Sequence, residues 1–199
     1  MYTNLILPLN CSVTYTKDFL SPIEAQELYD LLLNEYEIDQ SQLIIEAGGK
    51  KIATDSYKIL FATERLIEEN SHPENIHGKV YVWSGLMQKL KIRIEQLLHQ
   101  EFELAMCLYY PNGNFFTPYH FDQETSGYKT ILPSISLGEV REFCFKENNT
   151  EKVYSLDLAN GSLLVMKDYA QQRYMHALPK NEKYKKGRIN ITFREHNFK

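Results

Sequence analysis

Cysteine is scarce in this chain: three residues in 199, namely Cys11, Cys107 and Cys144. Their number is odd and their spacing is wide, so neither a disulfide framework nor a cysteine-based zinc site is expected. Reduced, mostly buried thiols of an intracellular protein are expected instead. Internal repeats and low-complexity tracts are also missing, and an apolar content of 43% suits one folded domain with its own core.

Long apolar runs are absent as well. No stretch approaches the roughly 20 apolar residues of a membrane-spanning helix. The first residues, Met1 to Leu7, lack the basic segment and the long apolar segment of a secretory signal. We therefore expect no membrane partner, a monomeric protein and a cytoplasmic location, with the nucleus as the alternative.

The chain has no excess of positive charge. Its 22 Lys and Arg residues stand against 26 Asp and Glu, which gives a net charge of -4. Proteins that hold duplex nucleic acid by its phosphates usually carry a basic face, so strong non-specific duplex binding is not expected. Basic residues do gather before the last strand, at Lys180, Lys183, Lys185 and Lys186.

The first hundred residues contain two helical patterns. Ser21, Pro22 and Glu24 form a helix start with a capping box, and apolar residues at helical spacing continue to about residue 35. A second helical pattern runs from 85 to 99. Between them we expect strands at 43–45 and 57–61 around a Gly48-Gly49 turn, and a helical turn near 63–69.

From residue 102 onward the pattern changes to short strands separated by turn residues. Helices followed by evenly spaced strands predict a mainly β fold with supporting helices (α+β), as an antiparallel barrel or jelly roll. We expect one domain over 1–199, in which a helical and β extension (1–100) packs on a β core (101–199). Expected core aromatic residues are Phe115, Phe116, Phe143 and Phe145.

The last strand pattern, from 188 to 194, alternates strictly. Alternate side chains of a strand point to opposite faces. The residues Ile189, Ile191 and Phe193 therefore face the core. The opposite face carries two arginines, which grip carboxylates through paired hydrogen bonds and so indicate a doubly anionic small ligand. That polar face consists of Arg188, Asn190, Thr192 and Arg194.

Three further residues form a metal-binding pattern. His120 and Asp122 lie two residues apart on one face of an extended segment, and His176 follows 56 residues after His120. Two histidines and one carboxylate form the facial triad of non-haem Fe(II) oxygenases, which leaves coordination positions open. A His-x-Asp pair alone is a weak signal. The third ligand and the two-arginine strand, in this order, make it specific.

These residues resemble the AlkB family of Fe(II)/2-oxoglutarate dioxygenases, which oxidatively demethylate nucleic acids. The resemblance covers more than half of the chain, in the order and with similar spacings to those of the family. The matching segments are 81–86, 110–113, 120–124, 135–138, 141–143, 161–166, 176–179 and 188–194, and the segment 15–20 resembles the family's entry into its first helix.

The resemblance implies a double-stranded β-helix core with N-terminal helices. It also implies Fe(II) held by the triad, with 2-oxoglutarate and O₂ as co-substrates. In the family, the position of Arg188 grips the distal carboxylate of 2-oxoglutarate and that of Arg194 acts beside the metal, while Asn190 shares their face and Tyr110 helps to hold the co-substrate. This chain departs from the family at Leu108, where an asparagine is usual.

Four residues match positions that the resemblance assigns to the substrate. Tyr81 and Trp83 correspond to residues around a flipped base, although Trp83 has a place in the core as the alternative. Glu124 is expected to face the same cavity as Asp122, or else the solvent. Arg141 is expected to contact phosphate.

The resulting hypothesis is an Fe(II)/2-oxoglutarate-dependent dioxygenase that removes N-linked alkyl groups from nucleic acid bases, a repair activity. The negative net charge and a polar turn at 48–51 favour a single-stranded substrate over a duplex. One alternative keeps the chemistry and acts on a protein or a small molecule. Another is a non-catalytic binding module, against which the intact triad and arginine pair argue.

Overall fold

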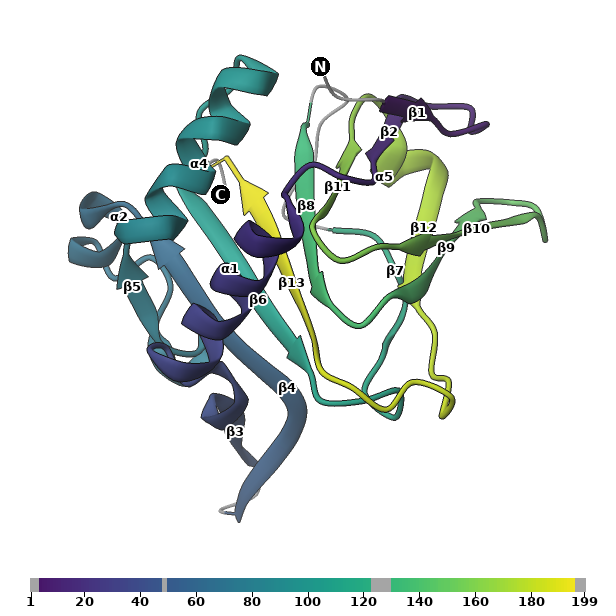
Figure 1. Ribbon diagram of the computed structural model, residues 1–199. Helices are drawn as coiled ribbons and strands as arrows, with labels where there is room; N and C mark the ends of the chain where they lie inside the picture. The colour runs from purple at the N-terminus through teal and green to yellow at the C-terminus, as the bar shows by residue number, and fades with distance from the viewer. Residues whose placement is uncertain (1–3, 48–49, 123–129, 196–199) are drawn as a thin grey trace.

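Two sheets of mostly antiparallel strands form the core of the computed structural model, which describes residues 4–47, 50–122 and 130–195 (Figure 1). The major sheet has the strand order β1 (Asn4–Ile6), β2 (Val13–Thr16), β11 (Ser162–Met166), β8 (Leu132–Gly138), β13 (Arg188–Arg194), β6 (Leu104–Tyr110), β4 (Lys50–Ala62), β3 (Gln42–Ala47), with β5 (Val80–Val82) paired parallel to β4. The minor sheet has the order β10 (Val153–Leu158), β9 (Arg141–Glu147), β12 (Tyr174–Leu178), β7 (Thr117–His120).

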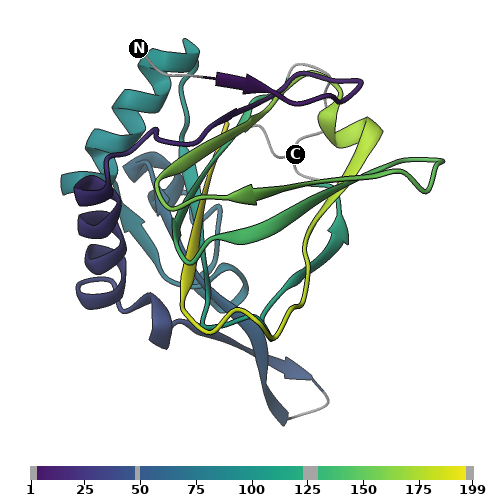
Figure 2. The ribbon, with the colours of Figure 1, turned by 45° about the vertical axis from the view of Figure 1, so that its right-hand side comes forward.

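Helices α1 (Pro22–Asn34) and α4 (Gly85–Leu98) cover the face of the major sheet that points away from the minor sheet (Figures 1 and 2). The largest cluster of buried side chains joins these helices to the sheet, with Leu28 and Leu32 from α1, Ile94 from α4, and Ile191 and Phe193 from β13. Four short helical segments complete the described chain: η1 (Ile38–Gln40), α2 (Glu64–Glu68), α3 (Glu74–His77) and α5 (Ala170–Arg173).

The predicted start of α1 is confirmed. The backbone N–H of Glu24 donates to Ser21 Oγ (3.3 Å), and the backbone N–H of Ser21 donates to Glu24 Oε2 (2.8 Å), which is the reciprocal pair of a capping box. The buried side chains Ala25, Leu28 and Leu32 follow at helical spacing. Local capping and the apolar stripe together determine where this helix begins and which face it buries.

The second helix is also found where the sequence predicts it, and one apolar face of it packs against the main core cluster. Met87, Leu90 and Ile94 are buried, Leu86 and Leu98 are partly buried against the same cluster, and Leu97 is 39% exposed. The preceding strands β3 and β4 are longer than expected, and the turn predicted at 48–49 lies outside the described residues.

The expected mainly β fold with supporting helices is confirmed, in the two-sheet arrangement of a jelly roll. Of the four expected core aromatic residues, Phe145 is buried and Phe143 and Phe115 are half-buried. Phe116 contradicts the prediction because it is 47% exposed. It lies in the connection that leads into β7, an edge strand of the minor sheet, where an aromatic side chain gains no second layer to pack on.

The cysteines and the helices agree with the expectations from composition. All three cysteines are free, with Cys107 and Cys144 buried and Cys11 half-buried. Burial raises the pKa of the Cys11 thiol to about 11, so it is protonated at neutral pH. Among the described residues, no helix has the length and apolar character needed to cross a membrane.

Candidate active site

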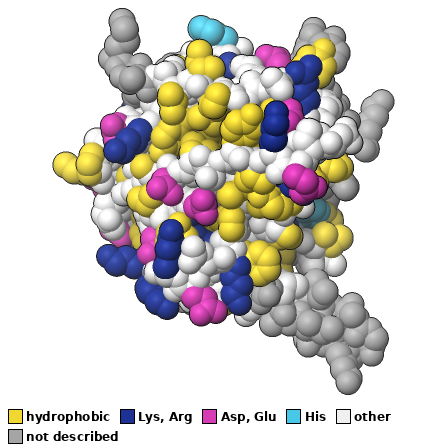
Figure 3. Space-filling model, turned by 90° about the vertical axis from the view of Figure 1, so that its right-hand side faces the viewer, with side chains coloured by type: hydrophobic (Ala, Val, Ile, Leu, Met, Phe, Trp, Pro, Cys, Tyr) yellow, Lys and Arg dark blue, Asp and Glu magenta, His cyan; other side chains and the backbone are white. Residues whose placement is uncertain are grey.

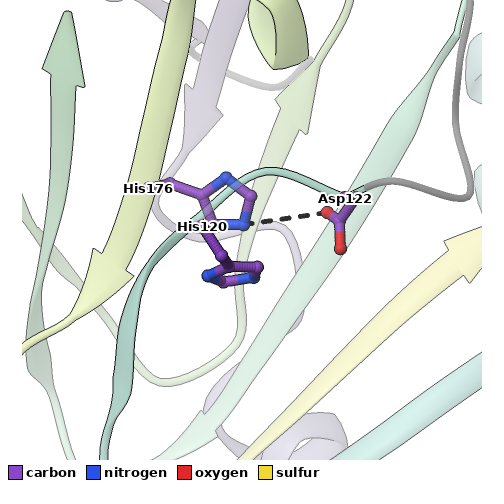
Figure 4. A group of neighbouring side chains, drawn as sticks. All are labelled: His120, Asp122 and His176. Carbon is purple, nitrogen blue, oxygen red and sulfur yellow. Dashed lines mark ion pairs between the residues drawn. The ribbon is translucent and has the colours of Figure 1, made fainter. Parts of the chain in front are cut away.

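The three residues of the metal-binding pattern lie together between the two sheets. His176 on β12 is the cross-strand partner of His120 on β7, and Asp122 follows directly after β7. One potential ligand atom from each residue lies within 4.8 Å of the others (Figure 4). Antiparallel pairing thus brings residues 56 positions apart to the same point, and the geometry suits one metal ion bound by two imidazoles and a carboxylate.

Both imidazoles are prepared for metal binding by their surroundings. His120 Nδ1 lies 2.9 Å from the carbonyl oxygen of Pro118, so Nδ1–H donates to that oxygen and Nε2 is the nitrogen available as a metal ligand. The His176 ring is stacked against Phe143, with ring centroids 5.5 Å apart. Burial lowers the pKa of His176 to about 4, against the opposing charge of Asp122. His176 is therefore neutral at pH 7, which is the form that binds metals.

Asp122 is held at two points. Its Oδ1 accepts a hydrogen bond from Arg194 Nη2 at 2.8 Å, and its backbone N–H donates to Gln171 Oε1 at 2.9 Å. Burial acts to raise the pKa of Asp122, but the positive charge of Arg194, followed by His176, outweighs it and the pKa is lowered. Oδ2 lies 3.7 Å from His176 Nε2, so this oxygen points to the place where a metal would bind.

The side chains of β13 alternate between the core under the helices and the cavity between the sheets, as the sequence pattern predicts. Ile189, Ile191 and Phe193 belong to the core under the helices, while the polar side chains face the cavity between the sheets. The cavity is lined by side chains of both sheets: Met106, Leu108, Tyr110, Thr117, His120, Asp122, Ser134, Phe143, Leu164, Met166, His176, Leu178, Arg188, Asn190, Thr192 and Arg194.

Arg188 provides a positive charge in this cavity without a carboxylate partner among the described residues. It is 2% exposed, and its Nη2 donates to the neutral acceptors Ser136 Oγ (2.9 Å) and Asn190 Oδ1 (3.2 Å). Its Nε is buried without a hydrogen-bond partner. Burial lowers the pKa of Arg188 to about 10, yet the group stays charged at pH 7. A buried charge of this kind is costly unless an anion pairs with it, which fits a carboxylate ligand.

The remaining polar groups of the cavity lie around Arg188. Tyr110 Oη and Thr117 Oγ1 are 2.8 Å apart, and the guanidinium of Arg188 lies 5.5 Å from the centre of the Tyr110 ring. Leu108, which replaces the family's asparagine, lines the cavity directly opposite Asn190 in the strand pairing. The sequence alone did not point to Thr117, Ser134, Ser136 or Gln171, because isolated hydroxyl and amide residues carry no spacing signal.

Tyr81 and Trp83, which were expected to surround the substrate base, do not line the cavity. Tyr81 pairs with Phe61 in the register of β5 and β4, so both rings point to the helix side of the major sheet. Trp83 stacks on Phe193 with centroids 6.0 Å apart, and its Nε1 donates to the carbonyl oxygen of Glu103 at 3.3 Å. Both rings therefore lie behind the sheet rather than in the cavity, and the alternative reading of Trp83 as a packing residue is the one that the structure supports.

Arg141 also contradicts its expected role. Its side chain is fully buried, its Nη1 donates to the carbonyl oxygens of Asn112 (3.3 Å) and Phe115 (3.1 Å), and its Nη2 donates to that of Pro179 (2.8 Å). A side chain with no exposed surface does not reach a nucleic-acid phosphate. Arg141 instead connects the loops that follow β6 and β12. Glu124 lies outside the described residues.

A comparison with protein families identifies this arrangement. The model described as "2OG-Fe(II) oxygenase superfamily" matches residues 12–194. The chain belongs to this superfamily. The triad and the cavity-facing arginines all fall within the matched region.

Two of the similar proteins carry names of the AlkB family. "Alpha-ketoglutarate-dependent dioxygenase alkB homolog 3" of Homo sapiens is 31% identical over 122 residues, which cover 56% of this chain and 43% of that protein. "DNA oxidative demethylase ALKBH2" of Bos taurus is 27% identical over 122 residues, covering 57% and 44%. "Uncharacterized protein R406" of Acanthamoeba polyphaga mimivirus is 31% identical over 107 residues, covering 53% and 56%. The chain spans about half the length of these relatives.

A solved structure described as "The structure of OsALKBH1" shares the fold. It aligns with a TM-score of 0.60 over 95% of this chain and 100% of that chain, at 14% identity. The resemblance to the AlkB family is confirmed by the relatives named alkB homolog 3 and ALKBH2, and the solved structure supports the fold. The cofactors expected from the sequence, Fe(II) with 2-oxoglutarate and O₂, are those of the superfamily. The cavity fits them, because it offers three metal ligands and a buried cation for a carboxylate.

Removing a triad ligand is expected to abolish metal binding while the protein stays folded. Asp122→Ala and His176→Ala each remove one of three ligands, whereas the buried apolar clusters lie around the site and stay intact. Calorimetric titration with Mn(II), followed by thermal melting with and without the metal, measures both properties. A variant that binds Mn(II) as tightly as the wild type would show that the ligand assignment is wrong.

Replacing Arg188 by methionine is expected to weaken 2-oxoglutarate binding at least about tenfold, because a charge-assisted hydrogen bond of roughly 1.5–3 kcal/mol is lost. The apo protein should melt at the same or a higher temperature, since a buried charge without a carboxylate partner is replaced by an apolar chain. Calorimetry on the Mn(II)-loaded protein tests this. Arg65→Met, on the exposed side of α2, is the matched control. Equal affinities for both variants would refute the role of Arg188.

Proposed function

We propose that this protein is an Fe(II)/2-oxoglutarate-dependent dioxygenase that removes N-linked alkyl groups from nucleic-acid bases. The observation that carries the proposal is the joint geometry of the cavity: a His-Asp-His triad and two arginines on one strand face. The relatives named alkB homolog 3 and DNA oxidative demethylase ALKBH2 support the substrate class. Fe(II) held by His120, Asp122 and His176 would supply oxidation of the alkyl carbon by O₂, coupled to conversion of 2-oxoglutarate to succinate and CO₂, with loss of the alkyl group as an aldehyde.

The chain's own residues have separate tasks in this reaction. Arg188 would bind the distal carboxylate of the co-substrate, as its unsatisfied Nε and its neutral neighbours suggest. Arg194 keeps Asp122 ionised, and Asp122 Oδ2 lies toward His176, where the metal would bind. Leu108, Leu164 and Leu178 give the cavity an apolar lining, which excludes water from the reacting carbon.

The aromatic contact with the substrate base must come from another residue than Trp83. Phe121 lies between the ligands His120 and Asp122 in the chain and is 47% exposed. Because His120 and Asp122 point into the cavity, backbone alternation directs the Phe121 ring to the opposite face, and Phe121 is not among the residues that line the cavity. An exposed aromatic ring still offers a surface on which a base can stack. We therefore propose that Phe121 stacks on a base that neighbours the target base, outside the cavity, whereas Tyr81 and Trp83 pack behind the sheet.

The charge of the surface bears on the form of the substrate. On the face of the molecule seen in Figure 3, basic and acidic side chains are interspersed among apolar ones. Together with the net charge of -4, this arrangement suits a substrate that is held mainly by its base rather than by many phosphates. A single strand meets that condition without the cost of opening a duplex.

A second candidate keeps the same chemistry and changes the substrate to a protein side chain or a small molecule. The negative charge and the position of Trp83 favour it. A panel assay separates the two. It offers N-methylated single-stranded DNA, duplex DNA and RNA with Fe(II), 2-oxoglutarate and ascorbate, and quantifies succinate and demethylated base. Succinate formation without any demethylated base in the whole panel would favour the second candidate.

Phe121→Ala is expected to lower kcat/KM on a methylated oligonucleotide by about 5- to 150-fold, because base stacking is worth roughly 1–3 kcal/mol. Its 2-oxoglutarate affinity and melting temperature should stay close to those of the wild type. Trp83→Ala is the comparison variant and should lower the melting temperature instead, since it removes a ring stacked on Phe193. The assignment fails if Trp83→Ala loses substrate affinity and Phe121→Ala does not.

The protein is expected to act on a single strand more efficiently than on a duplex of the same methylated sequence. The physical reason is that opening and unstacking the target base costs a few kcal/mol in a duplex and little in a single strand. The measurement is kcat/KM on both substrates at one fixed salt concentration. Equal or greater efficiency on the duplex would contradict this expectation.

A further inference from the structure

Gln171 is not one of the candidate metal ligands, but it contacts one of them, Asp122. It lies on α5, is 8% exposed, and its Oε1 accepts the hydrogen bond from the backbone N–H of Asp122 at 2.9 Å. Its Nε2 lies 3.5 Å from the sulfur of Met166, a residue of the cavity wall. The orientation of the amide is determined by chemistry, because the N–H of Asp122 is a donor and requires the oxygen.

The backbone at Asp122 needs this partner. Strand β7 ends at His120, so Asp122 lies beyond the ladder of hydrogen bonds that holds His120 opposite His176. A backbone N–H that is withdrawn from water without a partner is costly. Gln171 satisfies it and at the same time determines where the Asp122 backbone leaves the strand.

Gln171 also connects the two sides of the triad. It precedes His176 by five residues, and α5 leads directly into β12. The side chain thus links the segment that carries His176 to the segment that carries Asp122. Arg194 from β13 orients the carboxylate, and Gln171 from α5 orients the backbone behind it. Two contacts from different elements leave the Asp122 side chain little freedom.

We propose that Gln171 is a positioning residue that holds Asp122 at the distance from His120 and His176 that metal binding requires. The inference deepens the proposed function and rests on it, since it assumes that the triad binds a metal. Groups that orient metal ligands typically change metal affinity by about 10- to 100-fold when they are removed. The contribution therefore belongs to the metal site and differs from a simple packing role.

The chain offers a matched set of variants. Gln171→Met fills the same space without the acceptor oxygen, and Gln171→Glu keeps an acceptor at the same position. Gln172→Met makes the same chemical change at the next residue, whose side chain is exposed. If Gln171→Met does not melt cooperatively, Gln171→Asn replaces it, because it keeps the amide and draws it back by one methylene.

The experiment is titration of each full-length protein with Mn(II), read by calorimetry and by the electron paramagnetic resonance spectrum of the bound ion. Gln171→Met should bind Mn(II) about 10- to 100-fold more weakly, with an altered spectrum. Gln171→Glu should bind at least as tightly as the wild type and keep its spectrum. Gln172→Met should stay within about twofold of the wild type, as surface substitutions usually do.

The outcomes are distinguishable. Wild-type affinity and spectrum in Gln171→Met would overturn the role of Gln171 and leave the proposed function intact. Equal weakening in Gln171→Met and Gln171→Glu would also overturn it, since the acceptor would then be irrelevant. A wild-type protein that binds no Mn(II) would contradict the metal site itself, and both proposals with it.

Discussion

The ion pair between Arg194 and Asp122 is the contact on which the arrangement of the cavity depends. It joins a central strand of the major sheet to the end of β7, an edge strand of the minor sheet, and both side chains are largely buried. A buried pair returns little net stability because both charges lose their hydration. Its effect is positional: it keeps Asp122 ionised and turns one carboxylate oxygen toward the two histidines.

The same strand carries a second charge that is not neutralised in this way. Arg188 and Arg194 contribute two positive charges to the cavity, Asp122 contributes one negative charge, and His176 is neutral, so these four groups leave one net positive charge. A divalent metal would add two more. A dianionic co-substrate lowers this total of three positive charges to one, and the position of Arg188 behind Ser136 and Asn190 determines which end of the cavity the free carboxylate must occupy.

The two faces of the major sheet give the aromatic residues near the motifs different surroundings. Residues of β6 and β13 alternate between the helix-covered face and the cavity, and a shift of one position moves a side chain from one to the other. Tyr81 and Trp83 fall on the helix side and stabilise the packing of α4 against the sheet. Phe121 lies between two cavity-facing ligands in the chain, so its ring faces away from the cavity and remains exposed on the surface.

Local sequence patterns determined the type and order of the secondary-structure elements and most of the metal-binding residues. The capping box of α1, the alternation of β13, the His-x-Asp pair and the order of helices and strands are properties of neighbouring residues, and each was predictable for that reason. Tertiary structure alone decided the rest: that Trp83 packs behind the sheet, that Arg141 is buried among carbonyl oxygens, and that Gln171 reaches Asp122. These contacts join residues from 20 to 110 positions apart. Their partners are determined by strand register and layer packing, which a single sequence does not display.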